Sequence, residues 1–74
     1  MKNVKELLAQ LDGFVVDGKT LVKKEGDLTV TVYGEEDDLF AVAITLDGDD
    51  VASATGIKRE LLSQEISDLL ELIR

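Results

Sequence analysis

Residues 28–46 read LTVTVYGEEDDLFAVAITL, and the architecture expected for the chain follows from this segment. It holds two apolar segments, 28–33 and 39–46. In each of them, large apolar side chains at even positions alternate with side chains at odd positions that are mostly Thr or Ala. An alternation with a period of two is typical of a β-strand with one buried face. The segment between them is acidic and begins with Gly34, as loops often do. The stretch therefore predicts two antiparallel strands joined by a loop at 34–38.

Two turn signals extend this pair of strands toward the N-terminus. The dipeptides Asp17-Gly18 and Glu25-Gly26 each separate two short strand-like segments. Dipeptides of this kind form two-residue hairpin turns, most simply with the dipeptide at the centre of the turn. The sequence thus predicts four consecutive strands, each paired with the next.

The strand register can be tested by asking which side chains share a face. The predicted turns and loop pair Leu21 with Val30 and Val30 with Val42, and opposite residues lie on the same face. The apolar side chains that gather on that face are Phe14, Leu21, Leu28, Val30, Val32, Phe40, Val42 and Ile44. Since a slip of one residue would turn every side chain to the other face, this agreement predicts an antiparallel four-stranded meander.

Helical patterns flank the predicted sheet. Residues 3–11 combine a capping-box start with one apolar stripe, and residues 57–73 carry a broad apolar face behind a possible cap at Thr55. Residues 51–54 fit either a short fifth strand or a loop. We expect a single α+β domain over 1–74, with two layers: the sheet, and a short N-terminal and a long C-terminal helix packed on one of its faces.

The charge of the chain is uneven. Eight Lys and Arg oppose 16 Asp and Glu, which gives a net charge of −8, and no base stands between Lys24 and Lys58. In the predicted meander the acidic residues of this window fall at the two ends of the sheet, about 20–25 Å apart. One cluster is Glu35, Glu36, Asp37 and Asp38; the other is Glu25, Asp27, Asp47, Asp49 and Asp50. Such a field attracts basic proteins and repels nucleic acid.

Acidic turns also have a plainer explanation. Asp and Gly are favoured in turns for backbone reasons, and surplus charge keeps a small domain in solution. Lys58 and Arg59 lie in the first turn of the predicted last helix, where positive charge opposes the helix dipole. We expect them to pair with Asp49 or Asp50; the alternative is that they contact a partner.

The predicted sheet face away from the helices is neutral. Its side chains are Thr29, Thr31, Tyr33, Leu39, Ala41 and Ala43, with Val15, Thr20 and Val22 beside them. A flat neutral patch could pack on another sheet, in a homodimer or with a partner, and it could equally be an ordinary solvated face. Tyr33 is the one side chain of this patch that belongs to the types enriched at binding hot spots, and it stands next to the loop at 34–38.

Several classes of function are disfavoured. The chain has no Cys and no His, so a catalytic triad and thiolate or imidazole metal sites are impossible. Asp47, Asp49 and Asp50 offer oxygens to Ca²⁺, but Val51 and Ala52 stand where an EF-hand loop needs Asp or Asn and then Gly. We therefore expect no enzyme, metal or cofactor. The longest apolar run is about half a membrane span, and a chain without Cys is expected in the cytoplasm.

These features favour a small, non-enzymatic, acidic module that binds and inhibits a basic protein, such as a nucleic-acid-binding protein. The expected partner-binding residues are Tyr33, Glu35, Glu36, Asp37, Asp38, Asp47, Asp49 and Asp50. Two alternatives remain: a structural homo-oligomer joined through the neutral face, and a scaffold without activity, whether designed or natural.

Overall fold

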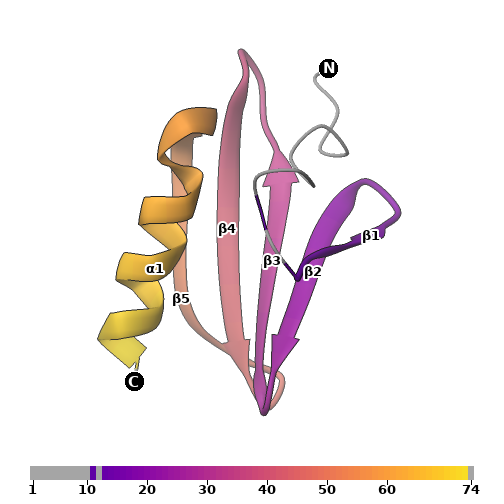
Figure 1. The fold of residues 1–74 in the computed structure, drawn as a ribbon, viewed down its shortest axis with the longest axis vertical. Helices are drawn as coiled ribbons and strands as arrows, with labels where there is room; N and C mark the ends of the chain where they lie inside the picture. Colours follow the sequence, from indigo (N-terminus) through magenta and orange to yellow (C-terminus); the bar gives the residue numbers. More distant parts are fainter. Residues whose placement is uncertain (1–10, 12, 74) are drawn as a thin grey trace.

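The computed structural model describes residue 11 and residues 13–73. They form one antiparallel sheet in the order β1-β2-β3-β4-β5, and the C-terminal helix lies along one of its faces (Figure 1). The elements are β1 (Val15–Asp17), β2 (Thr20–Glu25), β3 (Leu28–Gly34), β4 (Leu39–Leu46), β5 (Asp49–Lys58), the 3-10 helix η2 (Arg59–Leu61) and α1 (Leu62–Ile73). The predicted α+β class is confirmed.

Two details of the prediction need correction. The sheet has five strands, because β5 covers the whole of 51–54 and also the predicted start of the last helix. The helical segment therefore begins only at Arg59, as η2, and α1 has 12 residues. The predicted N-terminal helix at 3–11 lies outside the described residues, apart from Leu11, which is buried in the core.

The predicted hairpin registers are each displaced by two residues. Leu21 pairs with Val32 and Val30 with Ile44, where the sequence predicted Val30 and Val42 as their partners. In the third hairpin Gly34 pairs with Phe40, so the five residues between the paired positions are 35–39 instead of 34–38. In the first two hairpins the reason lies in the turns, where Gly18 and Gly26 have φ of +64° and +60°. Each glycine takes the first central position of its turn, as in a type II′ turn, so the whole pairing moves along.

A displacement by two residues leaves every side chain on its predicted face. Val30 and Val42 are fully buried, whereas Thr31 and Ala43, their neighbours along the strands, are half-buried on the other face. The core consists of Leu11, Leu21, Val30, Val32, Phe40, Val42, Ile44, Ile57, Leu62, Ile66, Leu69 and Leu70. The predicted alternation is thus confirmed, although its register is not.

A β-bulge shapes the last strand. Phe40 pairs with Ile57 but Val42 pairs with Ala54, so Thr55 and Gly56 together stand opposite the single residue between them on β4. The extra residue switches the alternation of β5 and turns Ile57 toward the core. Gly56 has a φ of +66°, and its N–H donates a 2.9 Å hydrogen bond to the Glu35 carboxylate.

Replacing Gly56 by alanine is expected to lower the free energy of unfolding by about 1–2 kcal/mol, the cost of a left-handed backbone for an L-residue. A Cβ added there meets no atom within 4 Å, so backbone strain is the whole effect. Urea unfolding followed by circular dichroism measures it. Ser53→Ala, an exposed position on the same strand, is the control and is expected to stay within about 0.5 kcal/mol of the parent. Equal stability of the two variants would contradict the strained geometry.

Candidate functional site

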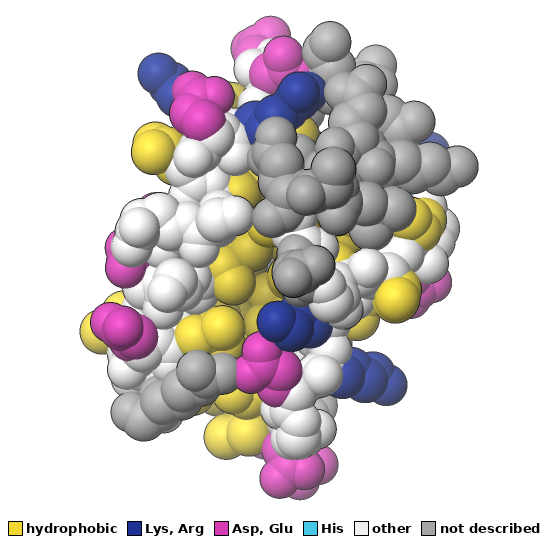
Figure 2. Space-filling view, viewed as in Figure 1, with side chains coloured by type: hydrophobic (Ala, Val, Ile, Leu, Met, Phe, Trp, Pro, Cys, Tyr) yellow, Lys and Arg dark blue, Asp and Glu magenta, His cyan; other side chains and the backbone are white. Residues whose placement is uncertain are grey.

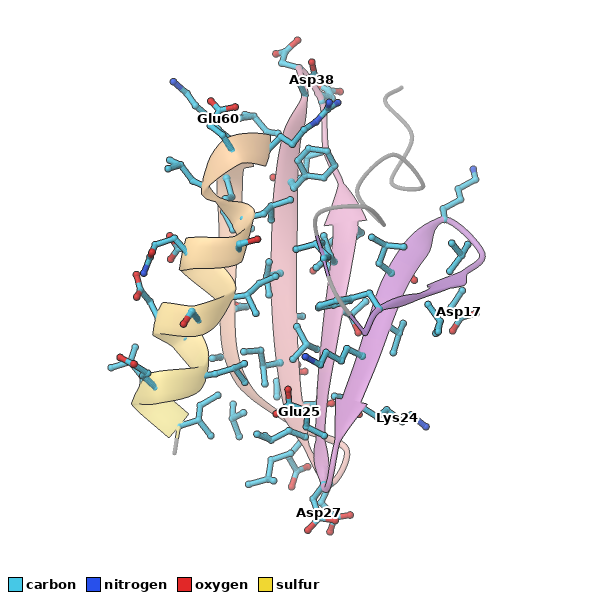
Figure 3. All side chains as sticks on the ribbon, viewed as in Figure 1. Asp17, Lys24, Glu25, Asp27, Asp38 and Glu60 are labelled. Carbon is cyan, nitrogen blue, oxygen red and sulfur yellow. The ribbon has the colours of Figure 1, made fainter. Side chains whose placement is uncertain are left out.

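The acidic residues singled out from the sequence lie at the two ends of the sheet, with Asp38 at one tip and Asp27 at the other (Figure 3). We call residues 35–38, the connection between β3 and β4, the loop end. We call Glu25, Asp27, Asp47, Asp49 and Asp50, at the β2–β3 and β4–β5 turns, the turn end. The space-filling view likewise shows acidic side chains at the upper and lower tips and apolar ones between them (Figure 2).

The turn end rests on two turns that are hydrogen-bonded to each other. The backbone N–H of Asp47 donates to the carbonyl oxygen of Asp27 at 2.9 Å. Asp47 and Gly48 have φ of +53° and +90°, and positive φ at both central residues is the geometry of a type I′ turn. Asp27 and Asp47 are exposed, so two turns whose backbones are hydrogen-bonded to each other each present a carboxylate to solvent.

Asp49 and Asp50 do not form one patch with each other. They are successive residues of β5, so their side chains leave opposite faces of the sheet. Asp50 pairs with Thr45 on the face away from α1, whereas Asp49 pairs with Leu46 on the helix side. The turn end therefore presents carboxylates on both sides of the sheet edge as well as at its tip.

The loop end is built differently. Its residues Asp37 and Asp38 have φ of +59° and +62°, which Asp tolerates better than most side chains. The loop is closed by hydrogen bonds from Glu35 N to Leu39 O (2.7 Å) and from Leu39 N to Glu36 O (3.1 Å). Because Glu35 also accepts the Gly56 N–H, its carboxylate stabilises the bulge and is a weaker candidate for partner contact.

The loop end also carries bases, which the sequence analysis had expected elsewhere. Because β5 runs antiparallel to the whole of β4, Lys58 pairs with Leu39 and lies beside the loop. The Arg59 guanidinium approaches the Asp38 carboxylate at 4.0 Å. The prediction that these bases pair with Asp49 or Asp50 is therefore wrong, since those residues lie at the far end of the same strand.

A pocket of about 410 Å³ opens at this mixed-charge end. Its lining residues are Asp37, Asp38, Leu39, Lys58, Arg59 and Glu60. The sequence does not predict this pocket, because residues 51–54 fit a short strand or a loop and residues from 57 onward fit a helix, whereas β5 extends to Lys58. The sequence feature that indicates this arrangement is a strand pattern interrupted by a glycine, because such a glycine often marks a β-bulge.

Tyr33 lies near the end of β3, two residues before the loop end. Its side chain is 37% exposed, and it shares a row of the sheet with Thr20 and Ala41, on the face away from α1. Tyr33 therefore belongs to the neutral sheet face more than to either acidic end.

The described bases leave most of the turn end without a counter-charge. Lys23 forms an ion pair with Glu25 at 3.1 Å and lies 5.9 Å from the centre of the Phe14 ring. No described Lys or Arg makes an ion pair with Asp27, Asp47 or Asp50. The turn end is therefore the more strongly negative of the two ends.

The described residues form neither a metal site nor a membrane-spanning helix. Within residue 11 and residues 13–73, no group of three or more acidic side chains is placed to hold a metal ion. In the same part of the chain, every helix is too short or too polar to cross a bilayer.

No protein-family model, curated protein or solved structure matches this chain. What the fold and the site define is a class: a two-layer α+β domain whose five-stranded sheet carries a helix on one face and carboxylates at both ends.

Proposed function

We propose that this protein is a non-enzymatic interaction module that binds a basic protein through the turn end and inhibits it. The single observation that carries the proposal is the hydrogen bond between Asp47 and Asp27, which holds two acidic turns side by side. Carboxylates on a fixed backbone lose little conformational entropy when they bind, so each contact with a base retains more of its energy.

The proposed partner is a protein that uses clustered Lys and Arg to hold phosphates. Arginine binds a carboxylate through two parallel hydrogen bonds, as it binds a phosphate. Exposed Asp27 and Asp47 at the tip, with Asp50 on the flank, would occupy such a cluster and exclude nucleic acid from it. The loop end is less suited to this role, because Lys58 and Arg59 would repel a basic surface. The absence of cysteine suits a cytoplasmic setting for this interaction.

The test begins with affinity capture from a lysate and continues with the purified partner. Titration calorimetry is expected to show binding that weakens at least about tenfold between 0.05 M and 0.5 M salt, because charge attraction dominates it. Labelled nucleic acid bound to the partner should be displaced in a fluorescence anisotropy assay. Affinity that does not depend on salt would overturn the proposal.

Two matched variants separate the turn end from the overall charge. Asp27→Asn/Asp47→Asn and Glu36→Gln/Asp37→Asn each remove two negative charges, and Asn tolerates the left-handed backbone of Asp47 and Asp37. The turn-end variant is expected to weaken binding about tenfold or more and the loop-end variant less than about threefold. Equal losses would show that only the net charge matters.

A further inference from the structure

The sheet face away from α1, here called the open face, is neutral at its centre and charged at its margin. Its middle row runs Val15, Val22, Thr31, Ala43 and Ser53 across all five strands. A neighbouring row runs Lys24, Thr29, Thr45 and Asp50, with a base on β2 and an acid on β5. Both of these charged side chains are exposed, and Lys24 projects from the lower half of β2 (Figure 3).

We propose that the open face is the interface of a two-fold homodimer in which β3 of each copy lies over β4 of the other. The proposal does not depend on the proposed function, which concerns the ends of the sheet, although Asp50 on the flank of the turn end belongs to both surfaces. It rests on the complementarity of the open face with itself, in charge and in side-chain size, and on its area.

The charge argument concerns the row from Lys24 to Asp50. A two-fold axis parallel to the strands and midway between β3 and β4 exchanges these two strands, and it also exchanges β2 with β5. The row of one copy then lies over the same row of the other copy in the opposite order. Lys24 therefore faces Asp50 of the partner subunit, and the dimer contains two such pairs. An axis perpendicular to the strands would bring each row over a different row and would make neither pair. The positions of the two charges therefore select one arrangement.

Side-chain size fits the same arrangement. In two aligned sheets packed about 10 Å apart, large side chains of one face fit over small ones of the other. The axis between β3 and β4 places Thr31 over Ala43 of the partner subunit and Val22 over Ser53 of the partner subunit, because these residues share one row of the sheet. Tyr33 is 37% exposed and can reach the opposing strand, which gives the dimer two aromatic anchors.

The area of the open face suits a reversible dimer. The described chain measures 30 × 20 × 19 Å, and the sheet extends along the longer two of these directions. Each copy can therefore bury at most about 600 Å², or about 1,200 Å² in total, the lower limit of specific interfaces. An interface at this lower limit is typical of weak or transient complexes, so we expect the dimer to dissociate within an experimentally accessible concentration range.

The acidic ends make a distinctive prediction about salt. In the proposed dimer both loop ends lie on one side and both turn ends on the other, about one Debye length apart across the interface at 0.1 M salt. Each copy carries a net charge of −8, so the copies repel each other. Salt is therefore expected to tighten the dimer, whereas it should weaken binding to a basic partner. The two proposals can thus fail separately.

Sedimentation equilibrium of the full chain at several concentrations and salt levels is the test, with three charge variants. Lys24→Glu and Asp50→Lys are each expected to weaken the dimer about tenfold, because each places two like-charged pairs in the interface. The double variant restores the pair in reverse and is expected to come within about threefold of the parent.

The control distinguishes the proposed pair from the net charge. Asp27→Lys changes the charge as Asp50→Lys does but lies outside the open face, so it is expected to leave the dimer unchanged or to tighten it. Thr31→Arg, which puts a charge at the centre of the open face, is expected to give a monomer with the circular dichroism of the parent. A parent chain that is monomeric at millimolar concentration and high salt would overturn the proposal. So would an Asp50→Lys variant that dimerises more tightly than the parent, or a double variant that does not recover.

Discussion

Replacing Phe40 by alanine is expected to lower the free energy of unfolding by about 3–5 kcal/mol. The ring is 1% exposed and is the largest fully buried side chain of the described residues. Its neighbours in the sheet are Gly34, which has no side chain to fill the space, and Ile57 at the bulge. Alanine would therefore leave a cavity that the surrounding strands cannot close.

Urea unfolding followed by far-ultraviolet circular dichroism measures this loss. A domain of 74 residues has only about 4–11 kcal/mol of stability, so the variant is expected to be partly unfolded already without urea. Leu72→Ala is the control, because Leu72 is 81% exposed on α1 and its truncation should cost less than about 0.5 kcal/mol. A loss below 1 kcal/mol for Phe40→Ala would show that the ring does not pack as described.

The second large effect compares two neighbours on one strand. Val30→Asp is expected to unfold the protein, since it buries an unpaired charge at a fully buried position, at a cost of several kcal/mol. Thr31→Asp adds the same charge one residue further on, on the open face, and is expected to cost about 1 kcal/mol or less. The two variants have the same net charge and nearly the same intrinsic strand preference, so only the face differs.

Circular dichroism and thermal unfolding at low protein concentration, where dimerisation plays no part, give the comparison. The expected result is a folded Thr31→Asp and an unfolded Val30→Asp. The reverse result would show that the sheet buries the opposite face, and the open face, the proposed dimer and the assignment of the core would all fail together.

The alternation of side chains in β3 and β4 predicted which face is buried, even though the predicted pairings were displaced. The face on which a side chain lies depends only on whether its residue number is odd or even along the strand. A displacement of the pairing by two residues therefore leaves each side chain on the same face. Register depends on the turn, and the dipeptides at 17–18 and 25–26 are compatible with two turn types. The glycine can take either central position, and only the packed sheet selects between them.

The end of β5 could not be predicted for a different reason. A regular strand would have placed Gly56 toward the core and Ile57 toward solvent, so the pattern predicts a short strand or a loop at 51–54 and a helix from residue 57. The bulge resolves the conflict, and the Glu35 carboxylate, 21 residues earlier, accepts the hydrogen bond of the Gly56 N–H. Such a distant partner is not visible in a local sequence pattern.

The candidate site was likewise predictable only in part. The sequence predicted two separated acidic clusters, because hairpin turns necessarily lie at the ends of a meander, and the structure has them there. The bases at the loop end depended on how far β5 extends, and so did the contact between Arg59 and Asp38. A prediction about charge neutralisation therefore needed the complete strand order.

The class of the fold, the buried face of the central strands and the accumulation of acid at the ends of the sheet were all predictable from the sequence. These properties follow from local period and composition, which do not depend on distant contacts. Only the tertiary structure decided the register, the fifth strand, the bulge at Gly56 and the placing of Lys58 and Arg59 beside the loop end. Each of these results from competition between near-equal local conformations, and the choice is made by packing and hydrogen bonds between residues far apart in the chain.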